Sequence, residues 1–448
     1  MSFNLLSAQD ISQTLDAKIQ NLMSAPNMLA ANVSFYVSDD KGNLVYEYNG
    51  NKGLSTASTQ KVFTAIAALE KLGKDYKYTT KVAYSGTISH GILNGDLYLF
   101  SNGDPTLGSW RYTGYKPEDF KKKFLEAIQE SGIKSINGNL IIDDSYFDAQ
   151  TTPGGWPWND IGNYYGAGVW GVNWNENQFD VNIAGAKQIK SFKYEPVNVR
   201  WINQLKAKGS GDQSIIYTAP FSEVIIIDGS LPANKTMTVS GSIPNPPMVL
   251  GNLMKNWLSE QNISLEGSVT TAHLEKLYGN EVQKFPEQKN FFQYHSPTLD
   301  KIIYWFLRKS VNLYGETLVK TFSTEKGESS FESGVAELKN FWKSKGIPTA
   351  MINFKDGSGL SPQNYVSAKA EVLALLYAQK QDYYSVFYEA LPTINGMKMK
   401  SGTINSSKAY AGYQKSKSGK NYVFSFIVNN YSGGDINAQM FQILDVLK

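Results

Sequence analysis

Ser58 and Lys61 are the first residues whose types and spacing indicate chemistry. They lie three positions apart in "STASTQKVFTAIAALEKLG" (55–73), where a helix would place both side chains on one face. The residues after Lys61 are apolar nearly all round, which predicts a buried helix. Burial lowers the pKa of a lysine towards neutrality, and Lys61 would then serve as a base for a nucleophilic Ser58. An N-cap serine beside a solvated lysine explains these residues about equally well.

Two later stretches favour the catalytic interpretation. "KSVNLYGE" contains Ser310 and Asn312, and "MKMKSGTI" contains Lys400 followed by Ser-Gly-Thr. Ser-x-x-Lys, then Ser-x-Asn, then Lys-Thr/Ser-Gly, in this order, is the motif set of penicillin-binding proteins and class A β-lactamases. Each motif is common by chance, but their order and their expected placement on a helix start, a helical region and a strand are not. A second Lys-Ser-Gly, at Lys417, falls in a turn between two strands and is discounted.

Composition excludes several other kinds of chemistry. The 448 residues contain no cysteine, so disulfides, thiolate metal sites and cysteine nucleophiles are excluded. The three histidines, His90, His273 and His295, lack metal-ligand spacing, and no metal or cofactor is expected. The formal net charge of +3 is too small, and its basic residues too dispersed, to indicate a nucleic-acid partner. No apolar run reaches the length of a transmembrane segment.

The pattern along the chain predicts one α/β domain split by an insertion. Residues 8–23 have helical spacing, and "NVSFYVSDDKGNLVYEY" has a hairpin pattern. Helical stretches return after residue 296, and the chain closes with two strand-like runs and an amphipathic helix. Between them, short strand-like runs alternate with Gly, Pro and Asn turns. We therefore expect one domain built from residues 1–75 and 281–448, and a β-rich insertion, 76–280, with two subdomains.

Longer stretches resemble the low-molecular-mass class C penicillin-binding proteins, the D-alanyl-D-alanine carboxypeptidase/endopeptidase family. The similar stretches include "LSTASTQKVFTAIAALEKLG", "NGDPTL", "INGNLIIDDSYFD", "YYGAGVWGVNWNEN", "SVNLYGETLVK", "DGSGLSPQN" and "AGYQKSKSGKNYVFSFIVNN". The resemblance covers nearly the whole chain after the first helix. It implies an α/β (α+β) penicillin-binding/β-lactamase-like domain, with a central antiparallel sheet flanked by helices and interrupted by a large β-rich insertion.

The resemblance also implies roles for four catalytic residues. Ser58 would attack the carbonyl of a D-Ala-D-Ala bond, and Lys61 would take the proton of its hydroxyl. Ser310 would relay a proton to the leaving amine. Lys400 would add positive charge near the nucleophile and, as a like-charge neighbour, would lower the pKa of Lys61.

Substrate binding is implied for the remaining motif residues. Asn312 would hold the backbone amide of the substrate, and the Ser401 and Thr403 hydroxyls, on the strand that contains Gly402, suit a terminal carboxylate. The backbone N–H groups of Ser58 and Thr403 would form the oxyanion hole. The segment before Lys400 is shorter than is usual in the family, which bears on substrate range and not on reaction type.

The function implied is a serine D,D-carboxypeptidase/endopeptidase that acts on peptidoglycan stem peptides or muropeptides and is acylated by β-lactams. Such a substrate implies a periplasmic or other extracytoplasmic location, with a signal segment absent from this chain. A homo-oligomer is left open. Two rivals are a β-lactamase or esterase on the same fold, and a non-catalytic peptidoglycan-binding envelope protein.

The aromatic run "GGWPWNDIGNYYGAGVWGVNWN" has two interpretations. Trp156, Trp158, Tyr164 and Tyr165 would either stack on sugar rings or pack the insertion against the main domain. We favour packing, because aromatic side chains most often bury apolar area.

Overall fold

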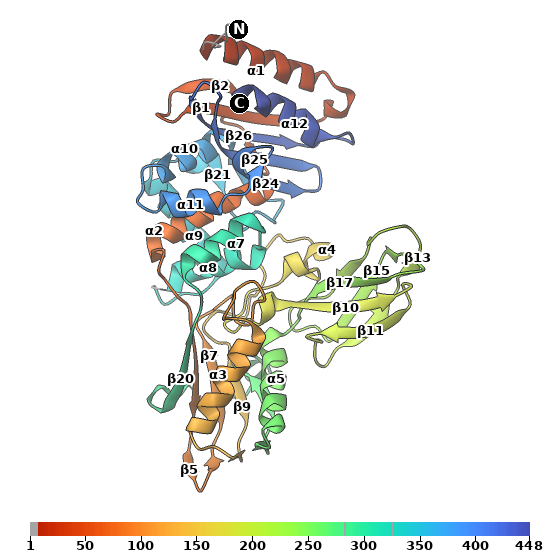
Figure 1. The fold of residues 1–448 in the computed structure, drawn as a ribbon, viewed down its shortest axis with the longest axis vertical. Helices are drawn as coiled ribbons and strands as arrows, with labels where there is room; N and C mark the ends of the chain where they lie inside the picture. Colours follow the sequence, from red (N-terminus) through yellow and green to blue (C-terminus); the bar gives the residue numbers. More distant parts are fainter. Residues whose placement is uncertain (1–7, 282–283, 325) are drawn as a thin grey trace. The chain divides into compact units, whose positions relative to one another are not determined.

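The computed structural model describes residues 8–281, 284–324 and 326–448, which form two compact units. Unit 1 comprises Met1–Tyr76, Pro153–Gly155 and Leu299–Lys448, and unit 2 comprises Lys77–Thr152 and Trp156–Thr298. Unit 1 therefore combines the two ends of the chain, as the red and blue segments of Figure 1 show.

A six-stranded antiparallel sheet is the centre of unit 1. Its strand order is β2-β1-β26-β25-β24-β23, so the first hairpin lies beside the last strands of the chain. Apolar side chains of α1 and α12 pack on one face, and α10 and α2 lie on the other side (Figure 1). The central antiparallel sheet flanked by helices is confirmed. The elements of unit 1 are α1 (Ala8–Met23), β1 (Asn32–Asp39), β2 (Leu44–Tyr48), β3 (Gly53–Leu54), the 3-10 helix η2 (Ala57–Gln60), α2 (Lys61–Leu72), α7 (Leu299–Arg308), α8 (Asn312–Thr324), α9 (Phe331–Ser344), β21 (Ile352–Asn353), β22 (Tyr365–Ser367), α10 (Ala368–Ala378), α11 (Tyr384–Ala390), β23 (Thr393–Ile394), β24 (Met397–Ile404), β25 (Ser407–Lys415), β26 (Asn421–Asn429) and α12 (Ile436–Leu444).

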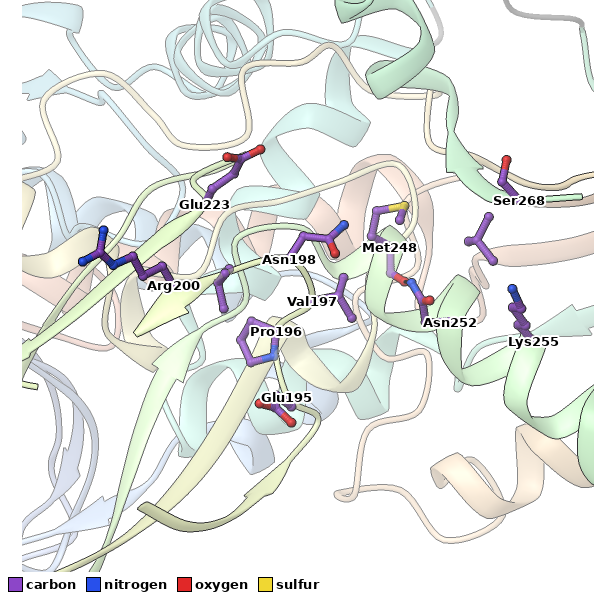
Figure 2. Close-up of a pocket in the computed structure, with 12 residues that line it drawn as sticks. Glu195, Pro196, Val197, Asn198, Arg200, Glu223, Met248, Asn252, Lys255 and Ser268 are labelled. Carbon is purple, nitrogen blue, oxygen red and sulfur yellow. Dashed lines mark hydrogen bonds between the residues drawn. The ribbon is translucent and has the colours of Figure 1, made fainter. Parts of the chain in front are cut away.

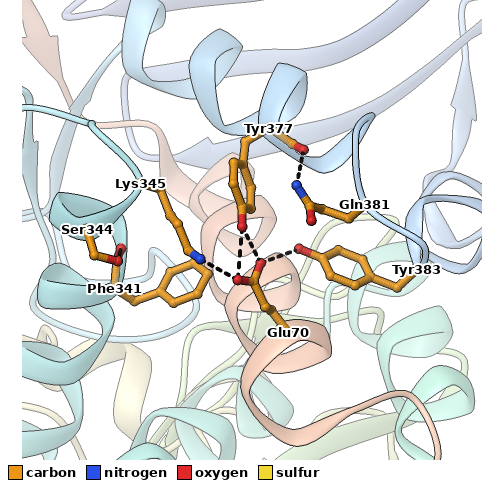
Figure 3. Close-up of polar contacts among 7 residues, drawn as sticks. All are labelled: Glu70, Phe341, Ser344, Lys345, Tyr377, Gln381 and Tyr383. Atoms are coloured by element: carbon orange, nitrogen blue, oxygen red, sulfur yellow. Dashed lines mark hydrogen bonds and ion pairs between the residues drawn. The ribbon is translucent and has the colours of Figure 1, made fainter.

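The end of α2 is fixed by a cluster of polar contacts around Glu70, shown in Figure 3. Its carboxylate accepts hydrogen bonds from Tyr377 on α10 at 2.7 and 2.9 Å and from Tyr383 at 2.9 Å, and it pairs with Lys345. Burial alone would raise the pKa of Glu70, but these donors outweigh it and hold that pKa below its usual value. Because Lys61 opens the same helix, the cluster anchors the helix that carries the candidate base.

Unit 2 contains several small sheets around one apolar core. A mixed five-stranded sheet has the order β19-β9-β7-β4-β20, and three-stranded sheets are formed by β11-β10-β17 and β12-β15-β14. The elements of unit 2 are β4 (Thr79–Tyr84), β5 (Thr87–Ser89), β6 (Ile92–Asn94), β7 (Leu97–Ser101), α3 (Pro117–Glu130), β8 (Ser135–Ile136), β9 (Leu140–Asp143), α4 (Trp158–Ile161), β10 (Gln178–Ala184), β11 (Gln188–Lys193), β12 (Arg200–Asn203), β13 (Lys206–Ala207), β14 (Ile215–Tyr217), β15 (Val224–Asp228), β16 (Ser230–Leu231), β17 (Thr236–Ser242), α5 (Pro246–Glu260), β18 (Ser264–Leu265), β19 (Val269–Thr271), α6 (Ala272–Leu277) and β20 (Asn290–His295).

The boundaries of the insertion differ from those read off the sequence. Strand β20 pairs with β4, so residues 290–298 belong to unit 2 rather than to the peptidase domain. Residues 153–155, inside the predicted insertion, belong to unit 1, where Ser361 Oγ donates to the Gly155 carbonyl at 3.3 Å. The insertion also contains the fourteen-residue helix α3, which the sparse helical periodicity did not reveal. Within the described residues, no helix is both long enough and apolar enough to span a membrane.

Candidate active site

Ser58 lies inside a tight turn and not at a helix cap. The turn is η2, whose N-cap is Thr56, and Ala57 has the uncommon positive φ of 47°. Thr59 Oγ1 lies 2.6 Å from Glu371 Oε1, and Ser425 Oγ donates to the other oxygen of this carboxylate at 2.6 Å. Glu371 is fully buried, and burial raises its pKa to about 7. The capping interpretation of Ser58 is therefore wrong, and its turn is held by a buried carboxyl group that the sequence did not single out.

Lys61 is completely buried, and three oxygen atoms surround its Nζ atom. Ser58 Oγ lies at 2.9 Å, Asn312 Oδ1 at 2.6 Å and the Ser358 carbonyl oxygen at 2.8 Å. A protonated lysine has three hydrogens to donate, so the ammonium form satisfies all three oxygens. The structure thus brings together two of the predicted motifs, Ser-x-x-Lys and Ser-x-Asn, which are about 250 residues apart in the chain.

The same contacts determine how Lys61 acts as a base. A neutral lysine keeps two N–H hydrogens and one lone pair. Asn312 Oδ1 and the Ser358 carbonyl require the two hydrogens, since neither oxygen can donate. The lone pair must then point at Ser58, whose hydroxyl becomes the donor. Loss of one proton from Lys61 would therefore reverse a single hydrogen bond, and Ser58 would then donate to Lys61 as an activated nucleophile does.

Burial lowers the pKa of Lys61 to about 7, although the nearby carboxylates of Glu316 and Asp356 oppose that shift. A lysine with an ordinary pKa is almost entirely protonated at neutral pH. At a pKa near 7, a large fraction carries the free lone pair, which suits a general base. The geometry and the lowered pKa are both those that a general base at Lys61 would require.

Glu316 on α8 shapes the loop that supplies the Ser358 carbonyl. Its two carboxylate oxygens accept the backbone N–H groups of Gly357 and Ser358, both at 2.9 Å. Asp356 accepts further N–H groups of the loop, from Gly359 at 2.7 Å and Ser361 at 2.6 Å. The sequence analysis did not predict Glu316 as a site residue. Its signal was a carboxylate in the largely apolar run "LYGETLV", four residues after Asn312.

Ser310 and Lys400 form the second polar pair of the site. Lys400 Nζ donates to Ser310 Oγ at 3.1 Å and to the Ser401 carbonyl at 2.8 Å. A lysine ammonium can only donate, so the Ser310 oxygen accepts and its own hydrogen is free to be donated. Burial lowers the pKa of Lys400 well below its usual value, and the positive charges of Lys61 and Lys408 lower it further. Ser310 has a φ of 58°, a strained value of the kind found at functional sites.

Strand β24 lies against the turn that carries Ser58. A Cβ atom on Gly402 would lie 2.1 Å from the Thr56 carbonyl oxygen and 2.9 Å from the Ser58 nitrogen, so only glycine allows this approach. Among the described residues, β23 pairs with β24 only at Met397 and Lys398, so the strand edge beyond them has no strand partner. An extended peptide can pair with such an edge.

Unit 2 has a concave surface of its own, which contains none of these groups. A cavity of about 850 Å³ lies between the 195–200 loop, α5 and β19 (Figure 2). Its charged side chains Glu195, Arg200, Glu223 and Lys255 are exposed. Its Ser268 hydroxyl donates to Asn139 Oδ1 at 3.2 Å, and an amide oxygen does not take a proton as a general base does. The three predicted motifs therefore all lie in unit 1, apart from this cavity.

The aromatic run of unit 2 divides into two groups. Trp156 is buried, whereas Trp158, Tyr164 and Tyr165 are 54%, 55% and 37% exposed. Burial of apolar area therefore accounts for Trp156 and leaves the other three rings wholly or partly at the surface. No cluster of three or more potential metal-ligating side chains occurs in the part of the chain that the structure describes.

Residues 15–447 match the D-Ala-D-Ala carboxypeptidase 3 (S13) family, which spans both units and all three motifs. The chain belongs to this family. It is an S13 serine hydrolase, and the resemblance stated from the sequence is confirmed.

Relatives of this S13 protein match most of its length. D-alanyl-D-alanine carboxypeptidase DacB of Haemophilus influenzae is 24% identical, over 91% of this chain and 88% of the relative. D-alanyl-D-alanine carboxypeptidase of an Actinomadura species is 26% identical, over 88% of this chain and 76% of the relative. The crystal structure of penicillin binding protein 4 (dacB) from Haemophilus influenzae has a TM-score of 0.78 at 23% identity and covers 98% of both chains, which confirms the fold class. A second crystal structure of that protein, at a TM-score of 0.72, 21% identity and 99% and 100% coverage, contains a β-lactam.

Proposed function

We propose that this S13 carboxypeptidase cleaves D-alanyl peptide bonds of peptidoglycan stem peptides through an acyl-enzyme on Ser58. The observation that carries the proposal is the position of Lys61, whose Nζ atom lies 2.9 Å from Ser58 Oγ while two further acceptors orient it. A serine with a buried, partly neutral lysine beside it is an activated nucleophile.

The steps follow from the contacts of the site. Lys61 takes the hydroxyl proton as Ser58 Oγ bonds to the carbonyl carbon of the substrate. The resulting oxyanion would be stabilised by the backbone N–H groups of Ser58 and Thr403. The C–N bond then breaks, and Ser310 passes its hydrogen to the leaving amine while it takes a proton from the Lys400 ammonium, from which its oxygen already accepts. The proton that Lys61 took from Ser58 then restores Lys400, so the net transfer is from the Ser58 hydroxyl to the amine. Water releases the acyl group in the second half-reaction.

The remaining motif residues have positioning roles in this proposal. The Oδ1 atom of Asn312 faces Lys61, so its amide nitrogen is turned away from the base. In this proposal that nitrogen donates to a carbonyl of the bound substrate. Thr403 is exposed on the strand that contacts the nucleophile turn, where a carboxylate of the substrate can reach it. Ser401, one residue after Lys400, lies on the same strand.

Mass spectrometry of the intact protein after incubation with benzylpenicillin tests the proposal. We expect one adduct per chain, located on the peptide that contains Ser58 and absent from Ser58→Ala. Ser268→Ala, in the cavity of unit 2, is the matched control and keeps the adduct. An adduct that persists in Ser58→Ala would refute the assignment of the nucleophile.

The same experiment separates the two rival functions. A β-lactamase on this fold would consume the drug and leave no lasting adduct. A non-catalytic binding protein would leave both the drug and the protein mass unchanged. Release of D-alanine from a peptide that ends in D-Ala-D-Ala then measures the peptidase activity directly.

We further propose that the protein works outside the cytoplasm, because its expected substrate is the cell wall. The proposal is supported by membership of a family whose curated relatives are D-alanyl-D-alanine carboxypeptidases. Fractionation of the native host with an antibody to this chain tests it, and recovery of all the protein in the cytosol would contradict it.

A further inference from the structure

The side chain of Lys408 contacts Thr403 of the third motif and has no role in the proposed chemistry. It extends from β25, where it is paired directly with Thr403 of β24 across the antiparallel ladder. Its Nζ atom donates to Thr403 Oγ1 at 2.8 Å and lies 5.2 Å from the centre of the Tyr410 ring. Among the described residues it makes no ion pair, so its charge is available to a ligand.

The direction of this hydrogen bond is fixed by chemistry. An ammonium group can only donate, so the oxygen of Thr403 accepts from Lys408 and the hydroxyl hydrogen of Thr403 must point elsewhere. Thr403 is exposed, so this hydrogen is directed at a partner from outside the chain. Lys408 therefore prepares Thr403 as a donor, and the two together present one positive charge and one directed O–H group.

The surroundings make an anion the natural partner. Lys408 is about half buried, so its charge is incompletely solvated, and this burial lowers its pKa. The positive charge of Lys408 also lowers the pKa of Lys400, so both cations act on the same region. Lys400 and Lys408 repel each other, and the Thr403 hydroxyl has a hydrogen to donate. A carboxylate would attract both lysines and accept the hydrogen bond from Thr403, so it is the ligand that this arrangement binds best.

We propose that Lys408 is a specificity-determining residue that binds, with Thr403, a free carboxylate of the substrate next to the bond that is cleaved. This inference rests on the proposed function for the identity of the substrate. Lys408, which lies outside the three motifs, would then select a substrate with a free C-terminal carboxylate over one with an uncharged C-terminus. Substrates that carry an amide or ester at this position lose the interaction with Lys408 and keep the rest of the site.

A paired comparison of substrates tests the inference. The substrates are an N-acylated peptide that ends in D-Ala-D-Ala with a free carboxylate, and the same peptide with a terminal carboxamide. We expect Lys408→Met to lower kcat/KM for the carboxylate peptide by about tenfold or more, the loss typical of a hydrogen bond to a charged group. The value for the carboxamide should change by less than about threefold, because that peptide offers no charge. Lys408→Arg should restore most of the discrimination.

Lys415→Met is the matched control, since it removes one lysine from the same strand at an exposed position away from the site. It should leave both kcat/KM values unchanged. An equal loss on both peptides for Lys408→Met, or no loss on either, would overturn the inference. A circular-dichroism melt of each variant shows whether it is folded.

A second pair of reagents separates this inference from the proposed function. The two reagents are benzylpenicillin, which has a free carboxylate, and its methyl ester, which does not, and the rate at which each acylates the protein is measured. If wild-type protein cleaves neither peptide, the proposed function fails. A preference for the acid over the ester that is lost in Lys408→Met would still uphold the role of Lys408, and an unchanged preference would overturn it.

Discussion

The carboxylate of Glu316 accepts the backbone N–H of Ser358 at 2.9 Å, and the carbonyl of the same Ser358 accepts from Lys61 at 2.8 Å. Glu316 thus contributes to the base in two ways: it holds the carbonyl that orients Lys61, and its charge opposes the burial that lowers the pKa of Lys61. Lys61, the 356–361 loop and Glu316 are thus connected by hydrogen bonds. A substitution at Glu316 should therefore change the rate at which Ser58 is acylated.

Glu316→Gln should impair acylation of Ser58 and shift its pH dependence. A glutamine has one acceptor oxygen, whereas the loop offers two N–H groups, so one is left unsatisfied at a cost of about 2 kcal/mol of stability. Burial raises the pKa of Glu316 to about 8, so its carboxylate is ionised mainly in the upper part of this pH range. Where it is ionised, the substitution removes a negative charge and lowers the pKa of Lys61, which should move the rise of the rate to lower pH. Stopped-flow acylation from pH 5 to 9, with a thermal melt, measures both effects. Glu389→Gln, an exposed carboxylate in the same unit, is the control, and an identical profile in the two variants would contradict the role of Glu316.

The acylation rate of the wild-type protein should rise with pH and level off above pH 7. Lys61 acts as a base only when neutral, and its pKa is lowered to about 7 by burial. Below that value the neutral fraction, and with it the rate, should fall about tenfold for each pH unit. Rate constants for benzylpenicillin across this range provide the measurement. A flat profile between pH 5 and 8 would show that Lys61 is not the base.

Gly402→Ala should abolish acylation while most of the fold remains. The added Cβ would meet the Thr56 carbonyl oxygen at 2.1 Å, which forces β24 away from the turn of Ser58. We expect a loss of at least about a hundredfold in acylation rate, because misplacement by about 1 Å is enough for a loss of that size. Gly211→Ala, where nothing lies within 4 Å, is the control for the substitution itself and should be silent. Wild-type acylation by Gly402→Ala would contradict the close approach.

Glu70→Gln should destabilise the protein at neutral pH and have little effect in acid. The folded-state pKa of Glu70 lies below its usual value, so the stabilisation is present above the unfolded pKa and is lost as the pH falls through the folded one. We expect a loss of about 1 kcal/mol at pH 7, since the side chain is partly exposed to solvent. Urea unfolding at pH 7 and pH 3 measures the difference, which should be small at pH 3. An equal loss in the free energy of unfolding at both pH values would mean that the charge of Glu70 does not contribute to stability.

The main features of the fold were predictable because they are local patterns. Helical spacing predicted α1, and alternation with a turn predicted the hairpin of β1 and β2. Helix α3 was not predicted because Pro, Lys and Glu dominate its exposed face and the stretch around it has β-like composition. The pairing of β20 with β4 was missed because the two strands are about 200 residues apart, and no local pattern specifies so distant a partner.

The sequence by itself determined the reaction class, since the order of the three motifs and the family resemblance both depend on residue types along the chain. It predicted that Ser58 and Lys61 share a helix face, because three-residue spacing has that geometric consequence. Only the tertiary structure places Glu316 and the Ser358 carbonyl around Lys61, and Lys408 beside Thr403. A backbone carbonyl has no sequence signature, and a buried carboxylate or a strand lysine gains its role only from neighbours that folding brings within hydrogen-bonding distance.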